Sequence, residues 1–354
     1  RGVDRFTNVR GEVHNAGVID SASNAVMIGR NVGNSGTIMA GAENGVVAMV
    51  AGDGVTLTPR GSNITIHVAD NPDNPAEPPA IGKAGVENTG RIAAPRGRSL
   101  MLANDVYSLA ARNTGSIKAR NITVESKGRG DVKIAGELNA SGGNGQTGGR
   151  IDVSGQRVLV DQAVLDASGP RGGGQINIGG EAYGGGSLTR SEATTIGPDA
   201  VLKADATRSG EGGQVVVWSD GSMRFHGEAS AKGGVVAGDG GFIETSGQNI
   251  DIRGGRADAG ARTEGGKGGK WLLDPFNVRI NNADGNPSGS PPMLDPFEPV
   301  ADSNIDADDF NGLGEAWVQV QAMDDRVRLK AGRIDANTLI EVERCLALFL
   351  GIAK

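Results

Sequence analysis

The sequence predicts an all-β solenoid whose short parallel strands stack from one repeat to the next, and three observations carry this prediction. Glycine supplies 59 of the 354 residues, far above its usual share of about 7%. A double glycine opens three strand-like runs at positions 212, 240 and 268, two steps of 28 residues. Four earlier segments share the pattern N-x-G-x-I. Such repetition is typical of a chain whose repeats bury their apolar faces only against their neighbours.

The N-x-G-x-I segments begin at Asn15, Asn34, Asn88 and Asn113. Each predicts a tight turn into a strand, because Asn tolerates the left-handed region and Gly takes positive φ freely. The isoleucine should then point inward, with Asn stacked over Asn and Ile over Ile. We place the successive apolar anchors of these repeats at positions 19, 38, 92, 117, 138, 165 and 202.

Two intervals between these anchors are long, and both contain loop-like sequence. Residues 70–82 are rich in proline, which a central strand cannot accept, and residues 179–195 are rich in glycine and threonine. We expect an insert at each place, and an additional repeat between positions 38 and 92 stays open as an alternative. Insertions at one corner are the usual way in which a solenoid varies.

The three double glycines are followed by the runs QVVVW, FIETSG and KWLLD, and each run by a second alternating one. Trp271 and Pro275 are expected to end a repeat, with the indole covering small residues and the proline stopping the strand. A binding role for Trp271 is the weaker alternative. We expect the solenoid over residues 1–280, an acidic proline-rich linker over 281–310, and terminal strands with a short amphipathic helix over 311–354.

Composition excludes several classes of protein. The net charge is −7 with both signs interspersed, which weighs against a nucleic-acid partner. Cys345 is the single cysteine, so no disulfide forms within the chain. No apolar run approaches the length of about 18 residues that a membrane-spanning helix needs. The chain begins at Arg1 without a signal peptide, and we expect an internal or processed segment of a longer protein.

The pair GDGGFIETSGQNIDIRG and GGKGGKWLLDPFNVRI, together with the N-x-G-x-I segments, resembles the filamentous haemagglutinin family of two-partner secretion exoproteins. The resemblance covers about residues 1–280 and implies a right-handed parallel β-helix. It also implies a secreted or surface-attached Gram-negative protein, exported through a dedicated outer-membrane transporter. Many members of the family are adhesins, and others carry a toxin at the far end of the same rod.

Catalytic and metal sites are not predicted, and no cofactor is expected. The carboxylates weighed as glycosidase candidates stand singly on outward positions: Asp152, Asp161, Glu181, Asp251 and Asp258. His14, His67 and His226 lie in different repeats, without cysteines or carboxylates beside them. The acidic stretch 302–308 has the oxygen spacing of a calcium loop, but lacks its glycine and its final glutamate. The glycines at 142–145 lack the aspartate of a calcium-binding repeat.

One surface feature favours binding. Six basic residues fall within little more than one repeat and could form a stripe that meets sulfated or sialylated host glycans: Arg112, Lys118, Arg120, Lys127, Arg129 and Lys133. Ordinary solubilising charge is the alternative. We therefore expect a non-enzymatic shaft segment of a secreted adhesin that attaches to host cells or glycans. The stalk of a contact-dependent toxin is the competing hypothesis, followed by a β-helical carbohydrate-active enzyme.

Overall fold

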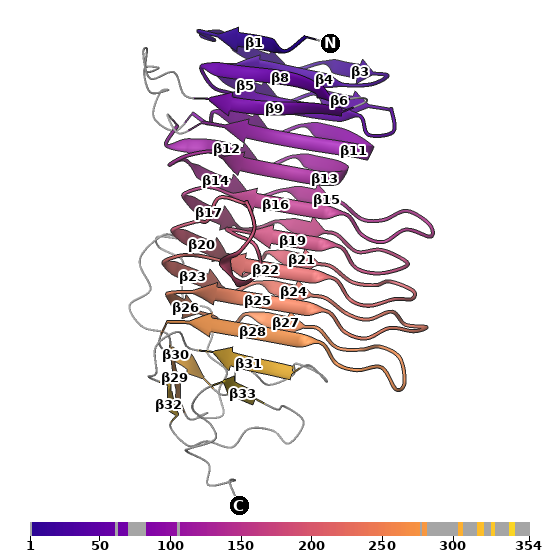
Figure 1. Ribbon diagram of the computed structural model, residues 1–354, viewed down its shortest axis with the longest axis vertical. Helices are drawn as coiled ribbons and strands as arrows, with labels where there is room; N and C mark the ends of the chain where they lie inside the picture. The colour runs from indigo at the N-terminus through magenta and orange to yellow at the C-terminus, as the bar shows by residue number, and fades with distance from the viewer. Residues whose placement is uncertain are drawn as a thin grey trace, which may run out of the picture. The chain divides into compact units, whose positions relative to one another are not determined.

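The computed structural model describes residues 2–60, 63–69, 83–104 and 107–276, and the strand segments 278–281, 304–306, 317–321, 327–329 and 340–343. The chain divides into two compact units. The first comprises Arg1–Ala140 and Arg150–Leu165, and the second Ser141–Gly149 and Asp166–Lys354. Both consist of strands stacked repeat upon repeat, mostly in parallel, which makes the chain a parallel β-helix (Figure 1). Among the described residues, no helix is long and apolar enough to cross a membrane.

Six parallel strands of the first unit form one sheet, with the order β2-β5-β10-β12-β14-β17. Their bounds are Glu12–Asn15 (β2), Asn31–Asn34 (β5), Val86–Asn88 (β10), Leu109–Asn113 (β12), Asp131–Ile134 (β14) and Arg157–Val160 (β17). The four motif asparagines are direct register partners in this sheet. The prediction that Asn stacks over Asn is therefore confirmed.

The other parallel strands of the first unit form stacks that include β11 and β13. These two strands are long enough for each half to pair with a different strand of the neighbouring repeat. β11 (Arg91–Ala103) bends at a register shift between Ala94 and Arg98. Its first half pairs with β6 and its second half with β7. The bounds are Val18–Ser21 (β3), Ala25–Gly29 (β4), Thr37–Ala40 (β6), Val46–Ala51 (β7), Ser116–Ser126 (β13), Glu137–Asn139 (β15) and Arg150–Ser154 (β16), with Val164–Asp166 (β18) at the boundary between the units.

The isoleucine anchors stack as predicted. Ile38 pairs with Ile19 on one side and with Ile92 on the other, and Ile92 pairs with Ile117. Leu138 follows Ile117 in the same column, and these side chains are fully buried from Ile38 onward. Because Ile38 and Ile92 are direct neighbours, no additional repeat lies between them, and that alternative was wrong.

The long interval instead holds an antiparallel sheet that the sequence did not predict. β8 (Gly54–Arg60) and β9 (Asn63–Ala69) form a hairpin, and β1 (Asp4–Thr7) pairs with β8. We expected both runs to be parallel strands of the solenoid. Only residues 61 and 62 separate them, a connection that favours a hairpin and is too short for a parallel crossover. The expected insert at 70–82 lies outside the described residues.

The glycine of the N-x-G-x-I motif has a different role from the one predicted. Neither Gly36, Gly90 nor Gly115 has a positive φ, and neither do the motif asparagines. A Cβ added at Gly90 would lie 2.1 Å from the carbonyl oxygen of Gly36, and one at Gly115 as close to that of Gly90. The motif therefore requires glycine because the backbone of the preceding repeat occupies the space of a side chain.

The motif asparagines form a hydrogen-bonded ladder between repeats. Asn15 Nδ2 donates to Asn34 Oδ1 over 2.8 Å, Asn34 Nδ2 to Asn88 Oδ1 over 2.8 Å, and Asn88 Nδ2 to Asn113 Oδ1 over 2.7 Å. Asn34, Asn88 and Asn113 are buried. Each buried amide thus depends on a neighbouring repeat for its partner.

We expect Asn88→Ala to lower the free energy of unfolding by about 1–3 kcal/mol, because it removes an acceptor and a donor from buried partners. Urea unfolding followed by circular dichroism measures the change. Asn15→Ala is the matched control, since Asn15 ends the ladder and is only partly buried. An equal loss in the two variants would contradict the ladder's role.

The second unit repeats the same architecture with three columns of parallel strands. The first column contains Gln175–Ile178 (β19), Gln214–Trp218 (β22), Phe242–Gly247 (β25) and Lys270–Pro275 (β28). The second contains Ala193–Ile196 (β20), Ser222–Phe225 (β23) and Asn249–Asp251 (β26). The third contains Val201–Lys203 (β21), Glu228–Ser230 (β24) and Arg256–Asp258 (β27).

Parallel pairing continues beyond Ile280, through strands in the segment 311–354, where we expected terminal strands, and through one short strand, 304–306, inside the expected linker. β31 (Trp317–Gln321) pairs with β28, and β33 (Ile340–Glu343) pairs with β31. β29 (Val278–Asn281) pairs with β30 (Asn304–Asp306) and with β32 (Val327–Leu329). The strand β33 lies where we expected the terminal helix, because Ile340 and Val342 alternate with glutamates at the period of a strand. The rest of that segment, and most of 281–310, lies outside the described residues.

Trp271 is a core residue near the beginning of β28, and only 1% of it is exposed. Its indole contacts the ring of Phe225 edge to face at 6.4 Å, and its Nε1 donates to Thr245 Oγ1 over 3.0 Å. Burial agrees with the expected structural role, and the contact with the aromatic ring of Phe225 was not predicted. Pro275 is the last residue of β28, and the stack nevertheless continues with β31.

Candidate functional site

The six basic residues of the expected stripe do not gather on one sheet. Arg112 on β12 and Lys133 on β14 are direct register partners. The others lie on β13, or in the turn that follows it: Lys118, Arg120, Lys127 and Arg129. Arg112 is paired with Glu87, and Lys127 is paired with Glu125 at 2.6 Å. The structure therefore brings together a pair of these residues and distributes the rest.

Four of the five carboxylates weighed from the sequence have structural partners, whereas Oδ1 of Asp161 is buried without a hydrogen bond. Asp152 accepts two hydrogen bonds from Arg150, and Asp258 pairs with Lys232 at 3.0 Å. Glu181 accepts from the backbone amides of Ser187 and Leu188.

Asp251 lies close to the buried His226, with 3.2 Å between His226 Nε2 and Asp251 Oδ2. Burial opposes ionisation of Asp251, but the hydrogen bonds from Arg253 and the neighbouring imidazole of His226 hold its pKa well below the usual range. In the described part of the chain, no group of three or more His, Cys, Asp or Glu residues could hold a metal ion. Of the acidic stretch 302–308, the structure describes Asn304–Asp306, a strand.

The second unit carries a long surface loop between β19 and β20. It corresponds to the insert expected at 179–195, contains the short 3-10 helix Ala182–Gly184 (η1), and ends where β20 begins at Ala193. Ser191 N donates to Gly179 O over 2.8 Å and closes the base of the loop. The indole of Trp218 lies so close to Gly180 and Gly184 that a Cβ at either would be within 2.8 Å of it.

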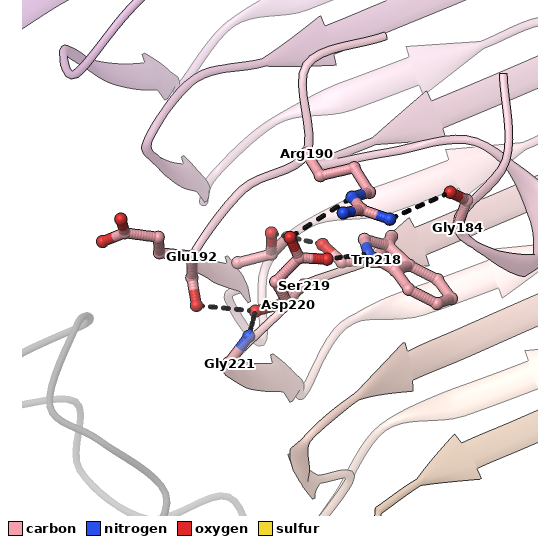
Figure 2. A network of polar contacts seen from close by, with 8 residues as sticks. Gly184, Arg190, Glu192, Trp218, Ser219, Asp220 and Gly221 are labelled. Carbon is pink, nitrogen blue, oxygen red and sulfur yellow. Dashed lines mark hydrogen bonds and ion pairs between the residues drawn. The ribbon is translucent and has the colours of Figure 1, made fainter. Parts of the chain in front are cut away.

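A polar network fastens this loop to the turn after β22 (Figure 2). Asp220 accepts a hydrogen bond from Trp218 Nε1 over 3.0 Å and pairs with Arg190 at 3.2 Å. Arg190 Nη1 donates to Gly184 O over 3.3 Å. Ser219 Oγ donates to Glu192 O over 2.8 Å. These contacts join the loop, at Gly184, Arg190 and Glu192, to the end of β22 and to the turn that follows it. The loop is therefore held in a defined place.

A buried carboxylate anchors the loop on its other side. Glu244 on β25 is 0% exposed and accepts hydrogen bonds from the backbone amide of Tyr183, 3.1 Å from each oxygen, and from Ser246 Oγ over 2.9 Å. Burial raises the pKa of Glu244 to about 7, against the opposing hydrogen bonds of Tyr183 and Ser246. Asp274, the register partner of Ser246, is also buried, which raises its pKa to about 6.

An open groove of about 570 Å³ lies beside this loop. Its floor contains the double glycines that precede β19, β22 and β25, at 173–174, 212–213 and 240–241. Its remaining lining residues are side chains of mixed chemistry: Gln175, Tyr183, Glu211, Gln214 and Phe242. The volume falls in the range of about 300–1,000 Å³ that is usual for ligand sites.

Sequence reasoning missed this groove and the buried Glu244. The double glycines were recognised as strand openings, and the 179–195 segment was recognised as an insert. No motif indicated that the insert and the double glycines line the same groove. The available signal was Glu244 itself, a charged residue within the otherwise buried run FIETSG. A carboxylate at such a position requires a partner that covers it.

The fold and these contacts define the class of protein: a parallel β-helix that carries a fastened surface loop beside an open groove. A solved structure with a similar backbone is the HMW1 secretion domain from Haemophilus influenzae, which is 22% identical with a TM-score of 0.49. The match covers 74% of this chain and 66% of that chain, slightly less than two thirds of it. No protein-family model matches the sequence, and no curated protein does.

Proposed function

We propose that this chain is a non-enzymatic segment of the β-helical shaft of a secreted exoprotein of the filamentous haemagglutinin type, and that it attaches the protein to host cells or their glycans. The observation that carries the proposal is the motif pair ending in Trp271-Leu-Leu-Asp-Pro275, on a chain that folds as a parallel β-helix with its motif residues in register. The place of action is the outside of a Gram-negative cell, secreted or bound to its surface.

The physical properties of the fold support this role. Each repeat stacks on its neighbours, so a feature encoded in successive repeats would be presented many times along the stack, which suits weak multivalent attachment. The single cysteine means that folding requires no disulfide within the chain. Both properties are compatible with export through an outer-membrane transporter of the two-partner type, followed by folding repeat upon repeat.

A catalytic role has weaker support. Glu244 and Asp274 are the carboxylates with raised pKa values, but Glu244 is covered by the loop and its oxygens accept hydrogen bonds from Tyr183 and Ser246. A catalytic carboxylate must reach its substrate. Loop anchoring is the better account of Glu244.

Attachment is tested with the fluorescently labelled chain and cultured epithelial cells. We expect saturable binding that falls several-fold when surface glycans are removed enzymatically. Binding no stronger than that of serum albumin would contradict attachment and leave the stalk of a toxin as the favoured function.

Charge variants test whether the basic residues take part. We expect the triple variant Arg120→Ala, Lys127→Ala, Arg129→Ala to bind less well to the cells. The matched control removes three exposed basic residues of the second unit, Lys203, Arg208 and Arg256. Equal binding by the two triple variants would exclude the basic residues as the contact, but not attachment itself.

A further inference from the structure

We propose that the groove beside Tyr183 and Phe242 binds an uncharged chain of pyranose sugars. The inference deepens the proposed attachment to glycans and rests on it for its biological meaning, but it assigns a different site and a different ligand chemistry from the basic residues. Four observations support it: an aromatic pair whose tyrosine is exposed, the contacts that hold this tyrosine, a row of side-chain amides, and the charge of the lining residues.

The aromatic pair forms one wall of the groove. The rings of Tyr183 and Phe242 lie 5.8 Å apart between centroids and 30° apart between planes. Tyr183 is 66% exposed, although a tyrosine usually buries most of its ring. The C–H face of a pyranose ring is apolar, and an exposed aromatic face is the surface on which it packs.

Tyr183 is held in this position against its own backbone preference. Its φ is 57°, the left-handed region that residues other than glycine rarely adopt. The hydrogen bonds from its amide to the fully buried Glu244 keep the ring over Phe242. Strain and a buried carboxylate both disfavour the folded state, and such features cluster where a side chain is pre-organised for a ligand.

The amides supply the polar edge of the site. Gln175 and Gln214 are direct register partners at the start of β19 and β22, and Phe242 is the next residue in that row. Successive repeats are about 4.8 Å apart, close to the length of one sugar unit in a chain. A side-chain amide offers both a donor and an acceptor, the combination that a sugar hydroxyl needs.

The charge of the groove selects against acidic sugars. Glu211 is the charged residue among its lining residues, all of which the structure describes, and no basic residue lines it. Within the lining, a sulfate or carboxylate on the ligand would meet the carboxylate of Glu211, while Lys270, the register partner of Phe242 in the next repeat, lies outside the lining. The groove therefore fits uncharged sugars, whereas the sulfated and sialylated glycans expected from the sequence would require the basic residues of the first unit.

Isothermal titration of the full chain with cellohexaose, maltohexaose and α-mannohexaose tests the proposal, and a heparin hexasaccharide is the charged comparison. We expect at least one uncharged hexasaccharide to bind. Tyr183→Ala should weaken that binding about tenfold through the lost aromatic contact. Tyr183→Phe should keep most of it. Gln214→Ala, on a rigid strand, should also weaken it, and this variant does not depend on how the loop tolerates substitution.

Phe276→Ala is the matched control, because Phe276 is an exposed aromatic residue of the same unit outside the groove. The proposal is overturned if none of the three uncharged hexasaccharides binds, if heparin alone binds, or if Tyr183→Ala and Gln214→Ala bind as tightly as Phe276→Ala. Cell attachment without binding of any uncharged hexasaccharide would refute the groove and leave the proposed function standing. Binding of an uncharged hexasaccharide without cell attachment would support the groove and refute the proposed function.

Discussion

Trp271→Ala is expected to lower the free energy of unfolding by about 3–5 kcal/mol, the usual cost of truncating a buried tryptophan. Trp271 is among the largest fully buried side chains, and its indole contacts Phe225 of β23 and Thr245 of β25. Truncation removes the edge-to-face contact with Phe225 and leaves the buried hydroxyl of Thr245 without its donor. Because β31 pairs with β28, the loss of stability should extend to the next repeat as well.

Urea unfolding measures this loss, and hydrogen exchange locates it. Protection of backbone amides should fall first in β25 and β28 and should stay unchanged in β12 and β14 of the first unit. Trp271→Phe is the control, because it keeps a ring against Phe225 and should cost less than half as much. If the alanine variant were as stable as the parent chain, Trp271 would not be a core residue.

Glu244→Gln is expected to stabilise the protein at pH 8 by about 3 kcal/mol and to have little effect at pH 5. Burial raises the pKa of Glu244 to about 7 from an ordinary value of 4.5, so the folded state holds the proton more tightly than the unfolded state. The contribution of Glu244 to the free energy of unfolding is therefore highest below pH 4.5 and declines as the pH rises to about 7. The difference between these two pKa values corresponds to about 3 kcal/mol. Glutamine keeps an acceptor for the Tyr183 amide without the charge.

The measurement is the thermal unfolding midpoint from pH 4 to pH 9 for the parent chain and the variant. The parent chain should lose stability between about pH 4.5 and pH 7, with a smaller contribution from Asp274, whose pKa is also raised by burial. The variant should show a flatter profile. Glu228→Gln is the control, since Glu228 is exposed on β24. Identical slopes for the parent chain and Glu244→Gln would show that Glu244 titrates normally.

Much of the fold was predictable because its signals repeat. The isoleucine column from Ile19 to Ile117 and the stacking of Asn15, Asn34, Asn88 and Asn113 were both expected from four copies of one motif. Repetition averages out local ambiguity, and parallel stacking converts a spacing in the sequence directly into a register between strands. The strands after the double glycines were predicted for the same reason.

Features that occur once were mispredicted. The hairpin of β8 and β9 was read as more solenoid, since its alternating residues do not distinguish parallel from antiparallel pairing. The terminal helix was expected from apolar spacing, but Ile340–Glu343 forms a strand that pairs with β31. One repeated feature was mispredicted as well: the motif glycines were assigned to turns, whereas the backbone of the preceding repeat is what excludes a side chain there.

The sequence by itself determined that this protein is a parallel solenoid, which asparagines and isoleucines stack, and where the insert at 179–195 interrupts it. Only the tertiary structure decided that the 179–195 insert lies over β22 and β25, that Glu244 anchors it, and that Tyr183 meets Phe242 beside a groove. The reason is physical. Stacking couples residues one repeat apart, which periodicity reveals, whereas the position of the insert depends on single contacts between residues as far apart as Tyr183 and Glu244, which no period encodes.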